Sequence, residues 1–176
     1  MRIYIARHGE TDWNLQNLVC GRTDLPLTTE GRRQARAMAA SLAGEPIGKI
    51  IASPLTRAQE TAAFVGEVLG LPVLTDSRLV EQDFGSFEGT PSLVPAFQAY
   101  RDQPALRYPG GESLLDVAAR AYSLLWELRA RPEENGVLLV CHGGVCRAIR
   151  TFFFDMSNEE LGEYTTENCQ VDTYHL

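Results

Sequence analysis

Short apolar runs alternate with longer amphipathic stretches along the 176 residues of this chain. Residues 3–6, 49–52, 72–75, 137–140 and 171–174 have the length and the β-branched content of buried strands. Helix-like periodicity begins near Thr28 or Thr29, at Thr56, at Ser113 and near Gly144. Because strands separated by helices usually pair in parallel, the pattern predicts an α/β fold whose mainly parallel sheet is covered on both faces.

Local capping signals predict where some of these helices begin and end. Thr56, with Gln59 three residues later, predicts a capping box at the start of one helix. Gly70 suits the end of that helix, where a positive φ is common. The stretch 11–26 has turn residues and is interpreted as a loop, and the proline-rich stretch 91–109 as a short helix within irregular chain.

Length and composition favour one domain over residues 1–176 and exclude some classes of function. The formal net charge of −7 argues against a general nucleic-acid binder. No apolar stretch approaches the ~20 residues that span a bilayer, and no signal peptide is visible, so no membrane association is expected. The four cysteines lack C-x-x-C spacing and are interpreted as free thiols of a cytoplasmic protein.

Two of the three histidines follow predicted buried strands and precede glycine. His8 follows the run 3–6 within Arg7-His8-Gly9-Glu10, and His142 follows the run 137–140 within Cys141-His142-Gly143-Gly144. One histidine at a strand end is most often structural. Ligands of α/β sheets bind beyond the carboxyl ends of the strands, so the pair predicts two imidazoles at one pocket.

The residues near these histidines favour an anion over a metal ion. Arg7 precedes His8, and Arg57 lies in the first turn of a predicted helix after another strand. Guanidinium groups match phosphate oxygens, and the helix starts at Thr56 and Gly144 add backbone N–H donors. An acid or base is still needed for chemistry on a phosphate, and either Glu81 or Asp83 could supply it.

Six ordered motifs give the chain a resemblance to a known family, the histidine phosphatase superfamily, also called the phosphoglycerate mutase-like family. They are Arg7-His8-Gly9-Glu10-Thr11 with Asn14; Gly21-Arg22-Thr23-Asp24 through Gln34-Ala35; Ser53-Pro54-Leu55-Thr56-Arg57-Ala58; Glu81 with Phe84-Gly85 and Glu88-Gly89; Pro109-Gly110-Gly111-Glu112-Ser113; and His142-Gly143-Gly144. The resemblance covers nearly the whole chain, and the order of the motifs makes it specific.

The resemblance implies a fold and a mechanism. The family fold is a three-layer α/β/α sandwich with a mostly parallel sheet, and such members need no metal or other cofactor. By similarity, His8 is the nucleophile that accepts the phosphoryl group. Around that group the resemblance places Arg7, Arg57 and His142, with Glu81 as proton donor to the leaving oxygen. Asn14 and the backbone around Thr23 are expected to line the phosphate site.

The segment from Thr90 to Tyr108 bears on the choice between phosphatase and mutase. Mutases of the family carry a longer insertion here, with extra basic residues for a second phosphate. This segment is short and contains only Arg101 and Arg107, both expected to be solvated at the surface. Its apolar residues suit the organic part of a substrate or simply pack within the segment itself; they are Leu93, Val94, Phe97, Tyr100 and Tyr108.

The sequence therefore predicts a metal-independent phosphatase acting on a small phosphorylated metabolite through a phosphohistidine. A cofactor-dependent phosphoglycerate mutase is the lesser hypothesis, and a non-catalytic phospholigand-binding protein is an alternative of another class. The choice among α-ribazole phosphate, phosphoserine and sugar phosphates stays open, as does the formation of a homodimer. Relatives often have Ser before the second histidine, where this chain has Cys141. A thiol is a weaker hydrogen-bond partner than a hydroxyl, so the sequence leaves open which residue supports His142.

Overall fold

A five-stranded sheet with the order β3-β2-β4-β1-β5 forms the centre of the computed structural model, which describes all 176 residues. The strands are β1 (Arg2–Arg7), β2 (Ile47–Ala52), β3 (Val73–Thr75), β4 (Gly136–Cys141) and β5 (Val171–His175). Four strands run parallel, and β5 pairs antiparallel with β1 at one edge. The predicted α/β fold with a mainly parallel sheet is confirmed.

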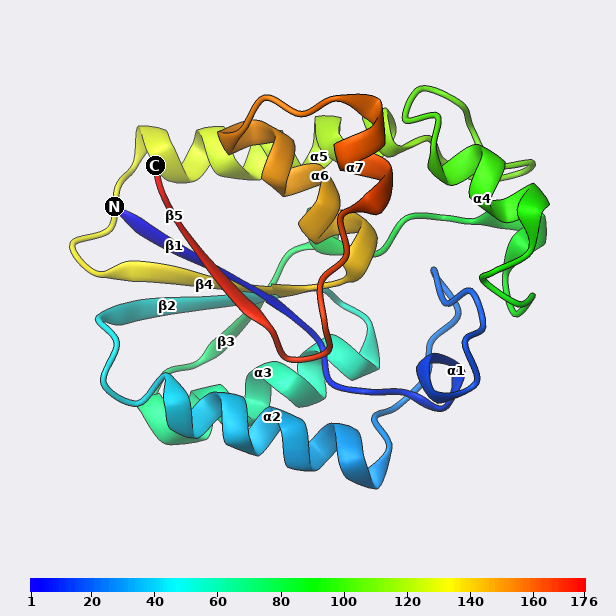
Figure 1. The fold of residues 1–176 in the computed structure, drawn as a ribbon. Coiled ribbons are helices and arrows are strands. Elements are labelled where there is room, and N and C mark those ends of the chain that lie inside the picture. The colour runs from blue at the N-terminus through cyan, green and yellow to red at the C-terminus, as the bar shows by residue number, and fades with distance from the viewer.

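Helices cover both faces of the sheet and complete a three-layer α/β/α sandwich (Figure 1). One layer contains α2 (Thr29–Ser41) and α3 (Thr56–Leu69), and the other contains α5 (Leu114–Ala130) and α6 (Gly143–Phe153). Alternate residues of β1 point into two separate cores: Ile3 and Ile5 into the α5–α6 side, Tyr4 and Ala6 into the α2–α3 side. Both faces are buried, which is why this strand is apolar throughout instead of alternating with polar residues.

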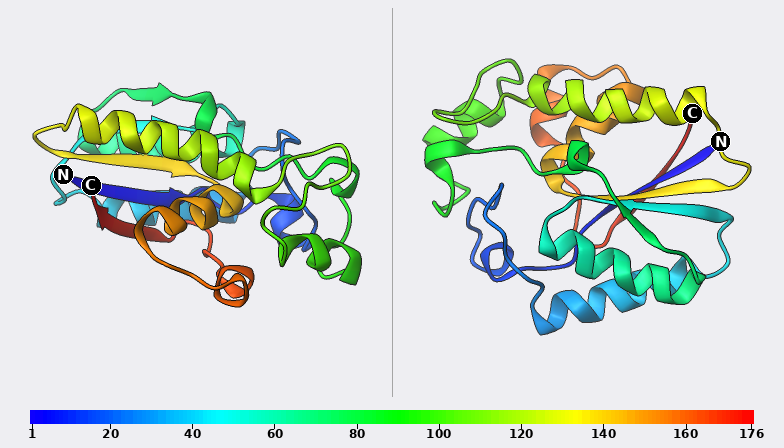
Figure 2. Two further views of the ribbon diagram at one scale, coloured as in Figure 1. Left: turned by 90° about the horizontal axis from the view of Figure 1, so that it is seen from above. Right: turned by 180° about the vertical axis from the view of Figure 1, so that it is seen from behind.

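The remaining short helices lie mainly beyond the carboxyl ends of the parallel strands. There, α1 (Asp12–Leu15) and α4 (Pro95–Arg101) project from one end of the sandwich (Figures 1 and 2). The two chain termini meet at the opposite end, where the Met1 ammonium group donates to the Leu176 carbonyl at 3.1 Å. The molecule therefore has a loop-rich end, where side chains from distant motifs gather, and an opposite end that holds the two termini.

The predicted capping box at Thr56 is wrong. Leu55 is the N-cap of α3 and no side chain caps it, so Thr56 is already helical. The Thr56 amide and hydroxyl both donate to the carboxylate of Asp24 at 2.8 Å, and the Gln59 side chain donates to the Ser53 carbonyl. A carboxylate from a distant loop thus takes the place of a local cap. Gly70 does end the helix with φ +67°, as predicted.

Two short helices occupy stretches where the sequence indicated none. These are α1, within the predicted loop 11–26, and α7 (Asn158–Glu163). Both begin with a capping box, formed by Thr11 with Asn14 and by Ser157 with Glu160. The Ser-x-x-Glu pattern at residue 157 was a readable signal for the second one. In the stretch 91–109 the predicted short helix is present as α4, and β2 begins two residues earlier than expected, at Ile47.

Two further predictions concern membranes and thiols. None of the helices combines the length and the apolar composition that crossing a bilayer requires. All four cysteines are free thiols; Cys141 and Cys146 are buried, with their sulfur atoms 3.6 Å apart.

Candidate active site

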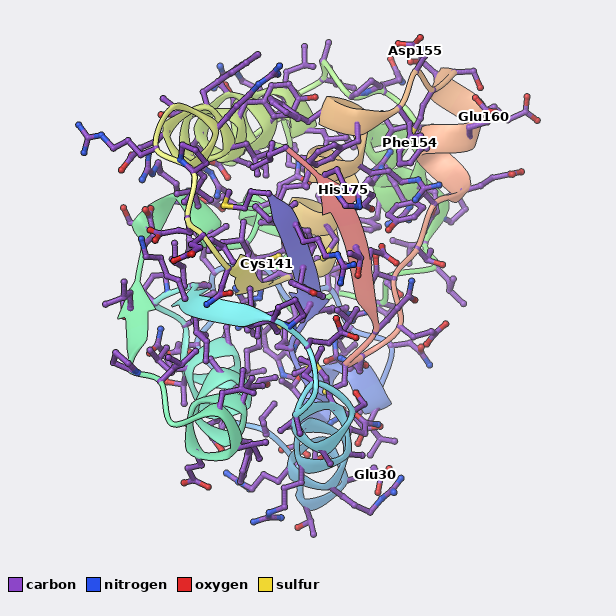
Figure 3. The ribbon with its side chains drawn as sticks, turned by 90° about the vertical axis from the view of Figure 1, so that its left-hand side faces the viewer. Glu30, Cys141, Phe154, Asp155, Glu160 and His175 are labelled. Carbon is purple, nitrogen blue, oxygen red and sulfur yellow. The ribbon has the colours of Figure 1, made fainter.

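The pairing of β1 with β4 brings the two strand-end histidines together. Arg7 lies opposite Cys141 in the parallel register, so His8 and His142 leave the sheet side by side. The His8 amide donates to the Cys141 carbonyl at 3.0 Å, and the imidazole centroids lie 5.0 Å apart. The third histidine, His175, is exposed near the end of β5, beside the opposite end of β1 (Figure 3). The structure thus unites the two predicted imidazoles and excludes the third.

The His8 ring is held in one tautomer. Its Nδ1 lies 2.7 Å from the Gly9 carbonyl oxygen. Because a carbonyl can only accept, Nδ1 carries the proton and Nε2 keeps its lone pair. Burial lowers the pKa of His8 well below its usual value, and the charges of Arg57 and Arg7 lower it further. The imidazole is neutral at neutral pH, which is the form that a nitrogen nucleophile requires.

Arg57 is fully buried behind this ring. Its Nε donates to His8 Nε2 at 3.2 Å, and its terminal nitrogens donate to the carbonyls of Thr23 (2.9 Å) and Gly21 (2.6 Å). The Thr23 hydroxyl donates to Glu88 at 2.8 Å. Thr23 therefore contributes to the site only through its carbonyl, which accepts from Arg57. Its amide and hydroxyl donate to the Glu88 carboxylate instead.

Arg7 and His142 complete the positively polarised surroundings of His8. Arg7 donates from Nη1 to the carbonyl of Thr166, and its Nε is buried without a hydrogen-bond partner. His142 is fully buried, and a 2.7 Å hydrogen bond joins its Nε2 to the Ser53 hydroxyl. Burial is also the main cause that lowers the pKa of His142 well below its usual value. Arg7 and Arg57 can neutralise the oxygens of an anion without a metal ion, and the neutral His142 ring can hydrogen-bond to them.

Support for His142 comes from Ser53, which belongs to one of the six motifs but had no predicted role at the site. Ser53, next to the strand end of β2, is buried and reaches the imidazole from a neighbouring strand. Cys141 takes no part, because its sulfur faces Cys146 in the core beneath α6. The thiol before His142 thus leaves the ring's hydrogen bonding untouched. Its position directly after the predicted strand 49–52 was the signal in the sequence that could have placed Ser53 at the site.

Glu81, not Asp83, is the carboxyl group at this site. Its two oxygens accept from the amides of Gln82 (2.7 Å) and Gly144 (3.1 Å), the latter in the first turn of α6. Burial raises the pKa of Glu81 despite these hydrogen bonds and the charge of Arg57. Asp83 accepts from the Gly85 amide and lies 3.7 Å from Arg22. Glu81 lines the cavity and its raised pKa favours the protonated carboxyl group, whereas Asp83 is not among the residues that line the cavity.

A cavity of about 340 Å³ opens in front of these groups. The predicted site residues that line it are Arg7, His8, Asn14 and Glu81; Arg57 and His142 adjoin the His8 ring, and Thr23 contacts Arg57. The Asn14 side chain accepts from the Thr11 amide and hydroxyl and contacts Asn168. Its hydrogen bonds hold the start of α1 against the C-terminal segment.

The segment 90–108 forms the outer wall of the cavity and corrects one expectation. Arg107 is exposed, as predicted, and pairs with Asp116. Arg101 is not solvated at the surface: it lines the cavity and donates to two backbone carbonyls. Its place on the inward side of α4 is decided by packing, which single-residue exposure statistics do not capture. A further cavity arginine, Arg147 of α6, was not predicted.

The apolar residues of this wall mostly pack against one another. Phe97 and Tyr108 line the cavity, with their rings stacked at 5.3 Å. Val94 and Tyr100 support them in the same cluster, and Leu93 is 79% exposed. Phe97 and Tyr108 are therefore placed to contact the organic part of a substrate, whereas Val94 and Tyr100 mainly pack within the segment.

Comparison with known proteins agrees with this geometry. The family model described as histidine phosphatase superfamily (branch 1) matches residues 3–176. The chain belongs to the histidine phosphatase superfamily. The resemblance inferred from the six motifs is thereby confirmed.

Relatives within the superfamily carry two kinds of name. A "Probable phosphoglycerate mutase GpmB" of Yersinia pestis (strain Pestoides F) is 37% identical over 178 residues, covering 97% of this chain and 83% of the relative. The structure of a mycobacterial glucosyl-3-phosphoglycerate phosphatase in complex with VO3 superposes with a TM-score of 0.90 at 33% identity, covering 98% of this chain and 91% of that one. A complex of the latter protein with inorganic phosphate gives a TM-score of 0.85 at 32% identity, covering 98% and 88%.

Membership in the histidine phosphatase superfamily supports enzymatic activity on a phosphate group, as a phosphatase or a mutase. No group of three or more His, Cys, Asp or Glu side chains is arranged to hold a metal ion. Metal independence itself stays a prediction.

Proposed function

We propose that this protein is a phosphomonoester hydrolase that works through a phosphohistidine on His8. The observation that carries the proposal is the orientation of the His8 ring. Its Nδ1 proton is given to the Gly9 carbonyl, and its Nε2 lone pair faces the Nε of buried Arg57. A phosphoryl oxygen that takes over this Arg57 hydrogen bond would leave the Nε2 lone pair free to attack phosphorus.

The first step forms a bond between His8 Nε2 and phosphorus while the ester P–O bond breaks. Arg7 and Arg57 neutralise the charge of the phosphoryl oxygens, which is what phosphoryl transfer chiefly requires. The neutral His142 ring can donate a hydrogen bond to them from Nδ1, which has no partner in the protein. Glu81 gives its proton to the departing alkoxide, and its raised pKa suits this role. In the second step Glu81, now a carboxylate, takes a proton from water as the water oxygen attacks phosphorus. The P–N bond then breaks, releasing phosphate and restoring neutral His8.

Hydrolysis is favoured over mutase activity by the short outer wall. The segment from Thr90 to Tyr108 contains one helix of seven residues and leaves the cavity accessible to water. The similarity to a glucosyl-3-phosphoglycerate phosphatase supports the same choice. Free thiols and the absence of a membrane-spanning helix are consistent with our further proposal of a cytoplasmic location.

Mutase activity remains the second candidate, because two observations favour it. Arg101 and Arg147 line the cavity and supply cations that a second phosphate would need. The curated relative named as a probable phosphoglycerate mutase supports it as well.

Phosphorus NMR of one reaction separates the two candidates. With 3-phosphoglycerate as substrate, we expect inorganic phosphate to accumulate without any bisphosphoglycerate primer. Isomerisation to 2-phosphoglycerate that outpaces phosphate release, and that depends on a primer, would establish the mutase. A third hypothesis is a non-catalytic phospholigand-binding protein. It would be supported if phosphomonoesters bind but neither phosphate release nor isomerisation occurs.

A further inference from the structure

Two guanidinium groups face the cavity without any carboxylate partner. Arg147 of α6 is only 5% exposed; it donates to the carbonyl of Leu161 at 2.6 Å and to the carbonyl of Arg101. Arg101 of α4 donates to the carbonyls of Gly162 (3.1 Å) and Tyr164 (2.9 Å). In each guanidinium, Nη1 makes no hydrogen bond with the protein, and both residues line the cavity.

Neither arginine belongs to an ion pair, although the chain carries a net charge of −7. The acidic groups that face the two arginines or line this cavity are Asp102 and Glu167, both exposed, and the buried Glu81; none approaches either guanidinium within 4.0 Å. Burial, together with the charge of Arg101, lowers the pKa of Arg147 to about 10. Buried charges in folded proteins are normally paired, so the buried Arg147 and the half-buried Arg101 beside it, both unpaired, call for an anion from outside the chain.

Tyr108 adds a third donor to the same wall. Its side chain is 3% exposed, it lines the cavity, and its hydroxyl makes no hydrogen bond with the protein. Burial raises the pKa of Tyr108 to about 12, so the hydroxyl keeps its proton at neutral pH. One phenol and two guanidinium groups therefore present donors to a single region, and the lining residues place that region in the same cavity as Arg7 and His8.

We propose that Arg101, Arg147 and Tyr108 bind a second anionic group, a carboxylate or a phosphate, on the organic part of the phosphomonoester. The inference rests on the proposed function, because it takes His8 and Arg7 as the site of the transferred phosphoryl group. A cavity of about 340 Å³ that is lined by both groups of donors can hold a small substrate with one charged end at each. The preferred substrates are accordingly small metabolites that carry a carboxylate or a second phosphate in addition to the reacting phosphate, not phosphate esters of neutral alcohols.

Matched substrates test this preference. We would compare 4-carboxyphenyl phosphate with its neutral isostere, 4-carbamoylphenyl phosphate, and 3-phosphoglycerate with glycerol 1-phosphate. A third arm, 1,3-propanediol bisphosphate, replaces the carboxylate by a phosphate and identifies which anion the wall prefers. Hydrogen bonds to charged groups predict a kcat/KM advantage of about ten- to one-hundred-fold for the charged member of each pair.

Two variants and a control locate the effect. Arg101→Gln should reduce the charged-to-neutral ratio of kcat/KM about tenfold or more, and Tyr108→Phe should reduce it less because the phenol carries no charge. Arg107→Gln, an exposed arginine of the same segment, should leave the ratio at its wild-type value. Thermal unfolding of each variant checks that it is folded. A wild-type ratio near one, or an equal ratio in Arg101→Gln, would overturn the inference while leaving hydrolysis through His8 in place.

Binding measurements keep the two proposals apart if no substrate is hydrolysed. Calorimetry with the non-hydrolysable 4-carboxybenzyl phosphonate and its carbamoyl counterpart measures the same preference without turnover. Tighter binding of the carboxylate by wild-type protein, reduced in Arg101→Gln, would support the subsite even where the proposed hydrolysis fails. Equal binding of the two phosphonates would refute the subsite independently of any activity.

Discussion

Replacement of Gly144 by alanine tests the assignment of Glu81 as the acid. A Cβ atom at Gly144 would lie 2.5 Å from Glu81 Oε1 and 3.3 Å from the Cβ of Gln82. The carboxyl group must therefore move by about 1 Å to regain ordinary van der Waals separation. A displacement of that size from a reacting atom costs about one-hundred-fold in rate, or about 2.7 kcal/mol. We expect this loss in kcat/KM for alkyl phosphates, whose leaving oxygen needs a proton.

The leaving group and a neighbouring glycine provide the controls. An activated ester, 4-nitrophenyl phosphate, departs without a proton and should lose less than about tenfold in Gly144→Ala; Glu81→Gln should give the same pattern. Gly143→Ala is the matched control, because its Cβ would meet nothing closer than Arg7 Nε at 3.9 Å. Both assays follow phosphate release under kcat/KM conditions. Gly144→Ala enzyme that hydrolyses alkyl phosphates at the wild-type rate would refute the role of Glu81 as the acid.

Three further predictions concern His8, metal ions and pH. Alkaline quench of the enzyme with a labelled substrate should trap an acid-labile, base-stable adduct on His8, and His8→Ala should abolish turnover; wild-type turnover in that variant would exclude the phosphohistidine. Activity should persist after exhaustive chelation with EDTA, whereas loss that Mg²⁺ or Zn²⁺ restores would contradict an anion site built from arginines. Unfolding free energy from urea titration should fall between pH 7 and pH 5, because His8 and His142 have lowered pKa values in the fold and take up protons only on unfolding. Each histidine lowers the unfolding free energy by at most about 1.4 kcal/mol for every pH unit below its unfolded pKa of about 6.5. Glu81 partly offsets this loss, because its raised pKa in the fold makes protonation favour the folded state as pH falls. His8→Gln should flatten this dependence, and a wild-type slope in that variant would contradict the burial argument.

Local sequence signals determined the layered fold and the first half of the site. The buried strands are recognisable because both faces of β1 and β4 pack against helices, which requires apolar residues without alternation. Parallel strands then bring their carboxyl ends to one edge, so the histidines after residues 7 and 141 were expected to meet, and they do. These conclusions need only the pattern along the chain and the geometry of a sheet.

Tertiary packing alone decided which polar groups complete the site. Ser53 supports His142 from another strand, Asp24 replaces the cap expected at Thr56, and Glu81 reaches the cavity while Asp83 turns away. Arg101 lies inward and Arg107 outward on the same segment. Each of these outcomes depends on contacts between residues distant in sequence, and on the cost of burying a charge, which is set by the surrounding fold and not by the residue itself.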